Sequence, residues 1–272
     1  MAHKTGLTSQ VVEIAKNLGA TLAGIASVEQ LKASPSFLVA PTMDPATGIG
    51  MWKSDLTREE VVWPEGFNSV VVVALKHSEK HPDLDWWDNW WENTNGGTPG
   101  NRIMMSITAG LSTWIREELH LNTAKLPYYI EDGGTFLKDA AVMAGLGSIG
   151  KNNILVTPDY GPRVRLYALL VDEELEATGP IGFDLCRSCS MPCRAACPQD
   201  AFGEVVFTEE RTITSCLPGR DGRFNRVACS VQMRIDLDKP EEVPVAEGNP
   251  STRLYIKFCR RCEMACPVGE GI

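Results

Sequence analysis

Seven of the nine cysteines in this 272-residue chain stand in two tightly spaced runs, and this spacing limits what the chain can fold into. The runs read Cys186-x-x-Cys189-x-x-x-Cys193-x-x-x-Cys197-Pro198 and Cys259-x-x-Cys262-x-x-x-Cys266-Pro267. Where thiols stay reduced, such short spacings are more typical of metal ligands or redox centres than of disulfides. The sequence therefore predicts a cysteine-rich part that binds a metal centre.

Both runs end in Cys-Pro, which indicates two [4Fe-4S] clusters. In two-cluster bacterial ferredoxins the cysteine before proline ligates the other cluster, so the runs exchange one ligand each. The first cluster is expected to take these four thiolates: Cys186, Cys189, Cys193 and Cys266. The second is expected to take these four: Cys197, Cys259, Cys262 and Cys216. Cys229 remains an alternative to Cys216, or else a small buried apolar residue.

Two observations qualify the cluster hypothesis. The first run has the three residues Ser-Met-Pro between Cys189 and Cys193, one more than usual, so this loop is expected to bulge. Zinc is the alternative metal, but a zinc ribbon separates its Cys-x-x-Cys pairs by about 15 to 20 residues. Cys189 and Cys259 stand much further apart.

Composition indicates a globular and acidic protein. The chain is 43% hydrophobic and 22% charged, with a formal net charge of -9. Most of the acidic excess precedes residue 178. Binding along a nucleic-acid backbone requires a basic surface, so a nucleic-acid substrate is not expected. The first residues contain neither a secretory apolar segment nor a twin arginine, and a cytoplasmic location without a membrane anchor is expected.

Hydrophobic patterning predicts helices and strands up to about residue 178. Residues 8–18 and 103–119 have helical spacing, the latter with Ile103, Ile107 and Ile115 on one face. Short β-branched runs predict strands at residues 21–26, 69–75, 126–130, 153–157 and 164–171. Turn-rich sequence follows, so a domain boundary is expected near residue 178.

The segments ATLAGIA, NSVVVVAL, LPYYIEDGGTFLKDAAVMAGLGSIGKNN and GPRVRLYALLVD, followed by the cysteine runs, resemble the superfamily of epoxyqueuosine reductases and reductive dehalogenases. The resemblance implies an α+β fold in which residues 1–178 form a nitroreductase-like domain that holds a cobalamin and the substrate. Residues 179–272 would form a ferredoxin-like domain with two [4Fe-4S] clusters. The chain ends six residues after Cys266, which suggests a short form without C-terminal helical repeats.

The resemblance also implies site residues in the first domain. Counting back from the glycine-rich segment places a proton-donating carboxylate at Glu131, with Asp132 beside it. The glycines and the lysine at its end are expected near the corrinoid: Gly145, Gly147, Gly150 and Lys151. From the residues alone, this segment equally fits a helix-to-strand turn that needs positive φ. It does not fit a dinucleotide-binding turn, which would follow a strand and open a helix.

Four tryptophans in the segment 86–91 have helical spacing, typical of core packing or of a wall over a planar ligand. His77 and His81 are also one turn apart, and solvent-facing positions are expected for both because no zincin glutamate accompanies them.

Together these features predict a cobalamin-dependent iron–sulfur reductase that removes an oxygen or halogen substituent from a small molecule. Its electrons would come from an external low-potential donor such as ferredoxin or flavodoxin. Three alternatives remain: an electron-transfer protein that reduces the corrinoid of a partner, an epoxyqueuosine (tRNA) reductase, and a flavin-dependent reductase. The substrate and the oligomeric state are not specified by the sequence.

Overall fold

A four-stranded antiparallel sheet forms the centre of the computed structural model, which describes residues 2–36, 63–88, 97–125, 135–212, 216–244 and 252–271. The strands lie in the order β1 (Leu22–Ser27), β2 (Ser69–Lys76), β7 (Val164–Val171) and β4 (Thr123–Ala124). β2 and β7 pair along their whole lengths, from Ser69 opposite Val171 to Lys76 opposite Val164. The sequence placed β1, β2 and β7 within a residue of their observed bounds.

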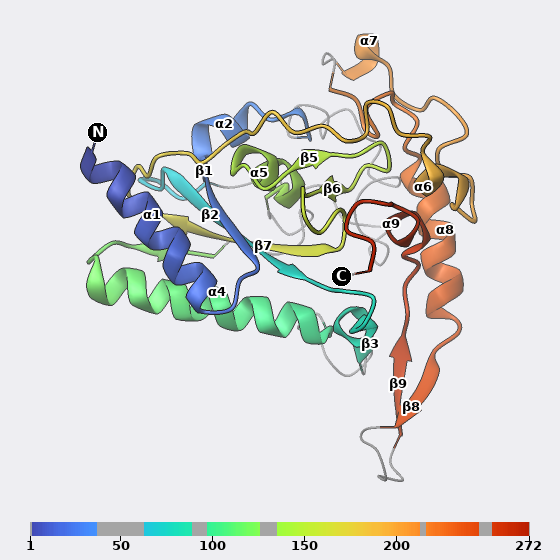
Figure 1. Cartoon of the computed structure of the whole chain (residues 1–272), viewed down its shortest axis with the longest axis horizontal. Coiled ribbons are helices and arrows are strands. Elements are labelled where there is room, and N and C mark those ends of the chain that lie inside the picture. The colour runs from blue at the N-terminus through green and yellow to red at the C-terminus, as the bar shows by residue number, and fades with distance from the viewer. Residues whose placement is uncertain are drawn as a thin grey trace.

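Helices cover both faces of this sheet, which explains why β2 is apolar at nearly every position. Val70 and Val72 point to the core under α2 (Val28–Lys32) and α5 (Leu137–Met143). Val71 and Val73 point to the opposite core, under α1 (Ala2–Asn17) and α4 (Pro99–Glu118). Figure 1 shows the resulting three layers, with α1 and α4 on one side of the sheet and α2 and α5 on the other.

The long helix α4 begins four residues before the predicted start at residue 103, at a capping threonine. The Thr98 hydroxyl accepts a hydrogen bond from the Asn101 amide at 3.1 Å, and Pro99 occupies the first turn. Ile107 and Ile115 are buried as predicted, but Ile103 is 41% exposed and Met104 takes the buried position instead. Among the described residues, no helix is long and apolar enough to span a membrane, α4 included.

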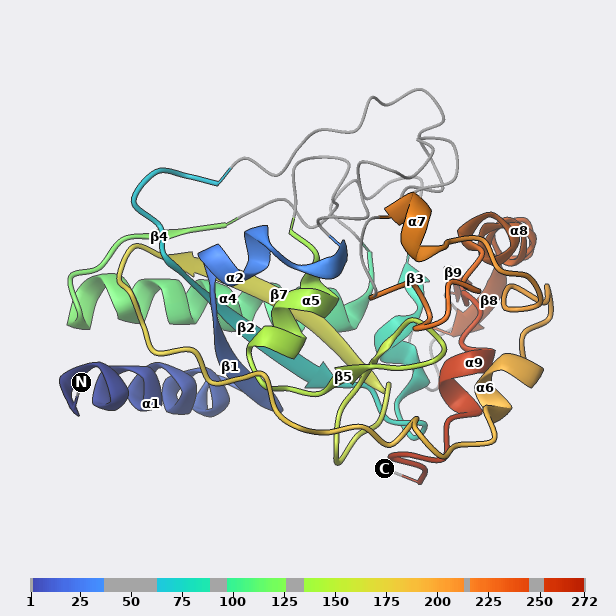
Figure 2. The same cartoon turned by 90° about the horizontal axis from the view of Figure 1, so that it is seen from above.

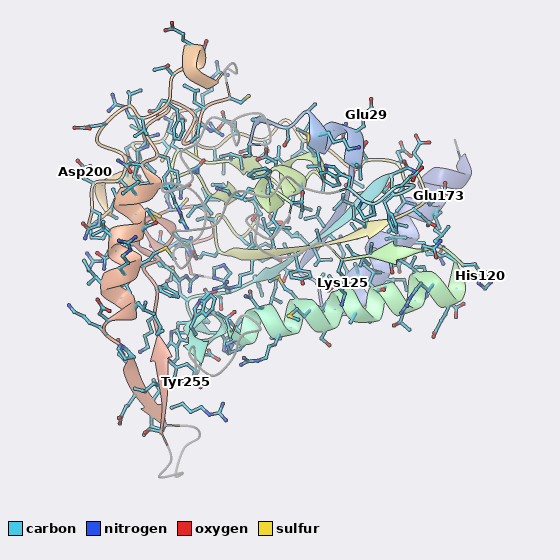
Figure 3. The ribbon with its side chains drawn as sticks, turned by 180° about the vertical axis from the view of Figure 1, so that it is seen from behind. Glu29, His120, Lys125, Glu173, Asp200 and Tyr255 are labelled. Carbon is cyan, nitrogen blue, oxygen red and sulfur yellow. The ribbon has the colours of Figure 1, made fainter. Side chains whose placement is uncertain are left out.

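The cysteine-rich residues gather at one end of the sheet (Figures 1 and 2). A second sheet there has the order β3-β9-β8, with the strands β3 (Trp87–Asp88), β9 (Thr252–Ile256) and β8 (Glu241–Pro244). The helices of this end are α6 (Pro192–Ala195), α7 (Glu209–Thr212), α8 (Arg226–Leu237) and α9 (Arg261–Met264). Because β3 precedes residue 178 and pairs with β9, strand pairing joins the two sequence regions. In Figure 3, Asp200 and Tyr255 mark this end, and His120 and Glu173 mark the opposite end.

Three smaller elements complete the described chain. The hairpin of β5 (Ser148–Ile149) and β6 (Leu155–Val156) follows α5, where a strand was predicted over 153–157. The 3-10 helix η3 (Pro82–Asp85) leads into β3. The predicted strand at 126–130 lies outside the described residues.

The helical interpretation of the tryptophan segment is wrong for its described residues, because Trp87 lies in a strand. The ring of Trp86 lies 5.7 Å from that of Tyr255, and the ring of Trp87 lies 5.6 Å from that of Phe258. Lys257 Nζ lies 4.2 Å from the centre of the Trp86 ring. These two tryptophans therefore pack against β9 and the residues after it. Residues 89–96, which include the other two tryptophans, lie outside the described residues.

The unequal burial of α4 residues gives a stability prediction. Ile115→Ala removes a side chain with 0% exposure and is expected to lower the free energy of unfolding by about 2–5 kcal/mol. Ile103→Ala, the matched control on the same helix, is expected to change it by about 0.5 kcal/mol or less. Urea unfolding followed by circular dichroism measures both values, and equal losses would contradict the burial of this face.

Candidate functional site

The first predicted set of cysteines comes together in the structure. Burial raises the pKa of the Cys193 thiol, and the neighbouring thiols of Cys266, Cys186 and Cys189 raise it further. Burial also raises the pKa of Cys266, with contributions from Cys186 and Cys189. All four thiols therefore lie within electrostatic reach of one another. Cys193 is carried by α6 and Cys266 follows α9, so the two runs meet here as the exchange of ligands requires.

The second group contains Cys229. Burial raises the pKa of Cys262 to about 12, and the thiols of Cys229, Cys259 and Cys197 contribute. Burial also raises the pKa of Cys259, and the Cys229 thiol contributes to this shift. Burial raises the pKa of Cys229 in the same way, and the Cys197 thiol contributes. Cys229, the alternative that the sequence left open, thus lies within electrostatic reach of the other three thiols of this group. Cys216 is exposed, and its role as the eighth ligand stays a prediction.

Backbone amides point at two of the sulfurs. The Met191 amide donates to Cys189 Sγ at 3.4 Å, and the Ala201 amide donates to Cys197 Sγ at 3.3 Å. Met191 has a φ of 63°, so the predicted bulge is a left-handed residue in the loop before α6. Hydrogen bonds to sulfur stabilise the negative charge of a ligated cluster and help to set its potential.

The donor set suits a cubane. In the described part of the chain, no three His, Cys, Asp or Glu side chains converge on one point as a single metal ion requires. Ligands of one zinc ion, each about 2.3 Å from the metal, would have to converge in that way. Each thiolate of a [4Fe-4S] cluster binds a different iron, so its four ligands are spread further apart. The chain offers two groups of four thiols, and in each group one backbone amide donates a hydrogen bond to a sulfur. This set of donors fits two such clusters.

Residues 148–153, which we call the docking strip, bind the cysteine-rich end through successive hydrogen bonds. Arg220 Nε donates to the Ile149 carbonyl at 2.6 Å, and Arg194 Nε donates to the Lys151 carbonyl at 2.9 Å. The Asn152 side chain donates to the Cys262 carbonyl at 3.4 Å. The Gly219 amide donates to Asn153 Oδ1 at 3.1 Å. This strip overlaps the glycine-rich segment that was expected at a cofactor.

The glycines of that segment contact the protein's own backbone. Gly145 has a φ of 74° at the end of α5, and a Cβ there would stand 2.7 Å from the Thr178 carbonyl oxygen. A Cβ on Gly147 would stand 2.2 Å from the Val156 carbonyl oxygen, and one on Gly150 would stand 2.6 Å from Asn152 Oδ1. These contacts account for the three glycines without a ligand. Their role at a corrinoid stays a prediction, as does that of Lys151.

A cluster of buried charges, which we call the ion cluster, lies between the sheet and the second cysteine run. Asp85 Oδ2 lies 2.6 Å from His77 Nδ1 and 2.7 Å from Arg260 Nη1, and Asp85 Oδ1 contacts Arg165 Nε. Arg260 also pairs with Glu263. Burial alone would raise the pKa of Asp85, but the hydrogen bond from His77 and the charge of Arg165 lower it to about 2. His77 is only 3% exposed, so its predicted solvent-facing position is wrong, whereas His81 is exposed as expected.

A cavity of about 270 Å³ opens beside the ion cluster. Its walls combine Lys138 of α5 with Arg260 and Glu263 of the second cysteine run, and the rest is mostly apolar. Burial lowers the pKa of Lys138 to about 8; the charge of Asp139 opposes this shift, the charge of Arg226 adds to it, and the Cys229 thiol makes a smaller opposing contribution. The cavity is therefore adjacent to the second group of thiols.

The cavity does not enclose a cobalamin. Pockets for drug-sized ligands measure about 300–1,000 Å³, and a cobalamin is larger than such ligands. This cavity alone therefore does not hold a corrinoid, and the place where one would bind stays a prediction. Glu131 and Asp132, the predicted proton donors, lie outside the described residues and stay a prediction.

The fold and the cysteine arrangement define a class of protein in which a helix-covered antiparallel sheet carries a cysteine-rich end. No protein-family model matches the chain. The epoxyqueuosine reductase of Gloeobacter violaceus is 28% identical over 206 residues, which cover 75% of this chain and 63% of that protein. A tetrachloroethene reductive dehalogenase of Desulfitobacterium hafniense is 39% identical over 109 residues, which cover 36% of this chain and 20% of that protein.

Solved structures agree with this class. Epoxyqueuosine reductase bound to an epoxyqueuosine-modified tRNA stem loop covers 98% of this chain with a TM-score of 0.62 at 18% identity, over 66% of its own length. A catabolic reductive dehalogenase with 3-bromo-4-hydroxybenzoic acid covers 96% with a TM-score of 0.56 at 16% identity, over 31% of its own length. The chain is therefore similar in sequence, over part of its length, and in fold, over nearly all of it, to epoxyqueuosine reductases and reductive dehalogenases. It spans between 31% and 63% of the lengths of three curated epoxyqueuosine reductases that it matches.

The two candidates for the eighth ligand can be separated by substitution. Cys229→Ala is expected to remove the second cluster and lower the iron content from about eight to about four per chain, because a [4Fe-4S] cluster needs its four thiolates. Cys216→Ala, the matched control, is expected to retain about eight irons. Iron analysis of anaerobically purified protein measures both. Loss of iron in Cys216→Ala alone would show that Cys216, and not Cys229, is the eighth ligand.

The ion cluster gives a further stability prediction. Asp85→Asn leaves the charges of Arg165 and Arg260 without their shared carboxylate and is expected to cost about 3–5 kcal/mol. The exposed Asp83 of the same 3-10 helix is the control, with a change of about 0.5 kcal/mol or less on mutation to Asn. Because the folded pKa of Asp85 lies below 3.8, its contribution is present above that pH and is lost as the pH falls towards 2. Equal denaturation midpoints for the two variants would contradict this account.

Proposed function

We propose that this chain is an iron–sulfur oxidoreductase that carries electrons through two [4Fe-4S] clusters to a substrate from which an oxygen or halogen substituent is removed. The observation that supports this most directly is the pair of thiol groups, each containing one cysteine contributed by the other run. This exchange places the clusters side by side, so each can pass one electron to the other. The relatives described above are all reductases, which agrees with this role.

Electron counting explains the value of two clusters. Removing an oxygen substituent as water consumes two electrons and two protons, and replacing a halogen by hydrogen consumes two electrons and one proton. A [4Fe-4S] cluster usually carries one electron at a time, so two clusters in one chain hold the pair that either reaction needs. An external low-potential donor, such as ferredoxin or flavodoxin, would refill them.

Cobalamin is proposed from the similarity to these reductases alone. When bound, it would supply the reactive metal that accepts the electrons and attacks the substrate. Glu131 or Asp132 is proposed to deliver the proton, because a carboxylate near an apolar cofactor can keep its proton at neutral pH. The ion cluster and the cavity beside the second thiol group would form the protein wall nearest to that chemistry.

For the substrate, the comparisons favour epoxyqueuosine in tRNA over the small molecule that the sequence suggested. In sequence, the similarity to the epoxyqueuosine reductase of Gloeobacter violaceus covers 75% of this chain, whereas the similarity to the tetrachloroethene reductive dehalogenase covers 36%. The net charge of -9 is an average over the whole chain. Local surface potential rather than net charge decides whether a nucleic acid binds. We therefore propose a tRNA substrate first, and a small halogenated or oxygenated molecule second.

A direct competition separates these substrates. Anaerobic, pre-reduced protein is mixed with an epoxyqueuosine-modified tRNA stem loop or with a panel of halogenated phenols, and single-turnover products are measured. We expect reduction of the stem loop, with affinity that falls as salt rises because phosphate contacts release counterions. Reduction of the phenols alone would reverse the order of the two proposals.

The absorption spectrum of the same sample tests the alternatives by cofactor. A corrinoid spectrum supports the proposed reductase, and stoichiometric flavin would identify a flavin-dependent reductase. Clusters with neither cofactor, together with no turnover of any substrate, would identify an electron carrier for a partner's corrinoid.

A further inference from the structure

Lys138 brings a positive charge from the sheet's helical layer to the second group of thiols. It lies on α5, far in sequence from the cysteine runs, and its ammonium donates to the Asn153 carbonyl at 2.7 Å. It shares the cavity wall with Arg260 and Glu263, which are the sequence neighbours of Cys259 and Cys262. Nothing in the proposed electron transfer requires a lysine at this position.

Arg163 brings a second positive charge to the first group of thiols. It lies just before β7 and is 0% exposed. Its Nη1 donates to the carbonyls of Cys266 at 3.1 Å and Val268 at 2.8 Å, and its Nη2 donates to the carbonyl of Met264 at 2.9 Å. Glu79, the anionic partner, accepts from Nη2 at 2.9 Å and from Nε at 3.1 Å, and its side chain is 38% exposed. The guanidinium therefore encloses the backbone of a proposed first-cluster ligand.

The two cations stand in matching positions. Each comes from the part of the chain before residue 178, and Arg163 donates to the backbone carbonyl of Cys266. Lys138 lines the cavity beside the residues that flank Cys259 and Cys262. Arg226 is a further cation near Cys229. A [4Fe-4S] cluster becomes more negative by one charge on reduction, so a fixed positive charge nearby stabilises the reduced form and raises its potential. The effect is large where water is excluded, because the effective dielectric constant is low.

We propose that Arg163 and Lys138 are tuning residues, which set the reduction potentials of the first and the second cluster respectively. The proposal rests on the two clusters of the proposed function and adds how their potentials are controlled. Arg163 acts through its guanidinium, which also donates a hydrogen bond to the Cys266 carbonyl. The carboxylate of Glu79 partly offsets the charge of Arg163. Lys138 acts as a single ammonium in the cavity wall, and Asp139, its neighbour in sequence, partly offsets its charge. The part of the chain that binds the substrate thereby controls the energy at which electrons reach it.

The test is a potentiometric titration of the cluster-loaded protein followed by electron paramagnetic resonance. The two signals are assigned with Cys193→Ser for the first cluster and Cys262→Ser for the second. Lys138→Met is expected to shift the midpoint of the second cluster to a more negative potential and to leave the first unchanged. Lys138→Arg keeps the charge and is expected to restore the midpoint. Lys239→Met removes the same charge from an exposed position after α8 and is the matched control, with no shift expected.

The first cluster is tested with one variant that removes the positive charge of Arg163 and one that removes its anionic partner. Arg163→Met is expected to shift its midpoint to a more negative potential. Glu79→Gln, a milder change at a partly exposed side chain, leaves the arginine charge without its counterion and is expected to shift the same midpoint to a more positive potential. If Arg163→Met does not assemble its clusters, the midpoint of Glu79→Gln tests the role of the Arg163 charge instead.

The opposite results overturn the proposal. Unchanged midpoints in Lys138→Met and Glu79→Gln would show that the two cations only hold the structure together. Equal shifts of both midpoints in each variant would show that the charges act on the whole protein rather than on one cluster. Failure of the proposed function is distinguishable, because wild-type protein would then contain neither cluster signal.

Discussion

The buried guanidinium of Arg163 joins the sheet to the cysteine-rich end, and much of the rest depends on this junction. An arginine without solvent is costly unless every donor is paired, and Arg163 meets this condition with three carbonyls and Glu79. Those carbonyls belong to the segment that contains Cys266, so the same bonds position a proposed cluster ligand. The position proposed for the first cluster therefore depends on the start of β7 as well as on the cysteine loops.

The remaining contacts across this junction are polar as well. The docking strip presents backbone carbonyls and asparagine side chains to Arg194, Arg220 and Cys262. The ion cluster adds paired charges on the other side of the cavity. Polar junctions fix orientation more strictly than apolar ones, because a shifted hydrogen bond leaves a buried group unpaired. Such strictness suits electron transfer, which depends steeply on the distance between centres.

The sequence predicted the elements whose pattern is local. β7 was placed from a run in which seven of its eight residues are apolar, and α4 from its helical spacing. The sequence could not place residues whose role depends on partners that are far away along the chain. Cys229 stands alone in sequence and joins its group only because α8 packs beside the second run, while His77 is buried by a carboxylate and an arginine from two other elements. The sequence around Arg163 has one notable local feature, a charged residue directly before an apolar strand. The role of this arginine became clear only from its hydrogen-bond partners in the structure.

The glycine-rich segment shows why a motif needs its surroundings. By sequence alone it equally fits a cofactor cradle and a helix-to-strand turn, because both require small residues and positive φ. In the structure the turn itself uses Gly145 and Gly147, and the residues after it bind the cysteine-rich end. A single segment thereby sets the distance between α5, which carries Lys138, and the second group of thiols. Any change in the length of this turn would move the Lys138 ammonium relative to the second group of thiols, so the spacing of this turn is constrained even without a ligand in contact with it.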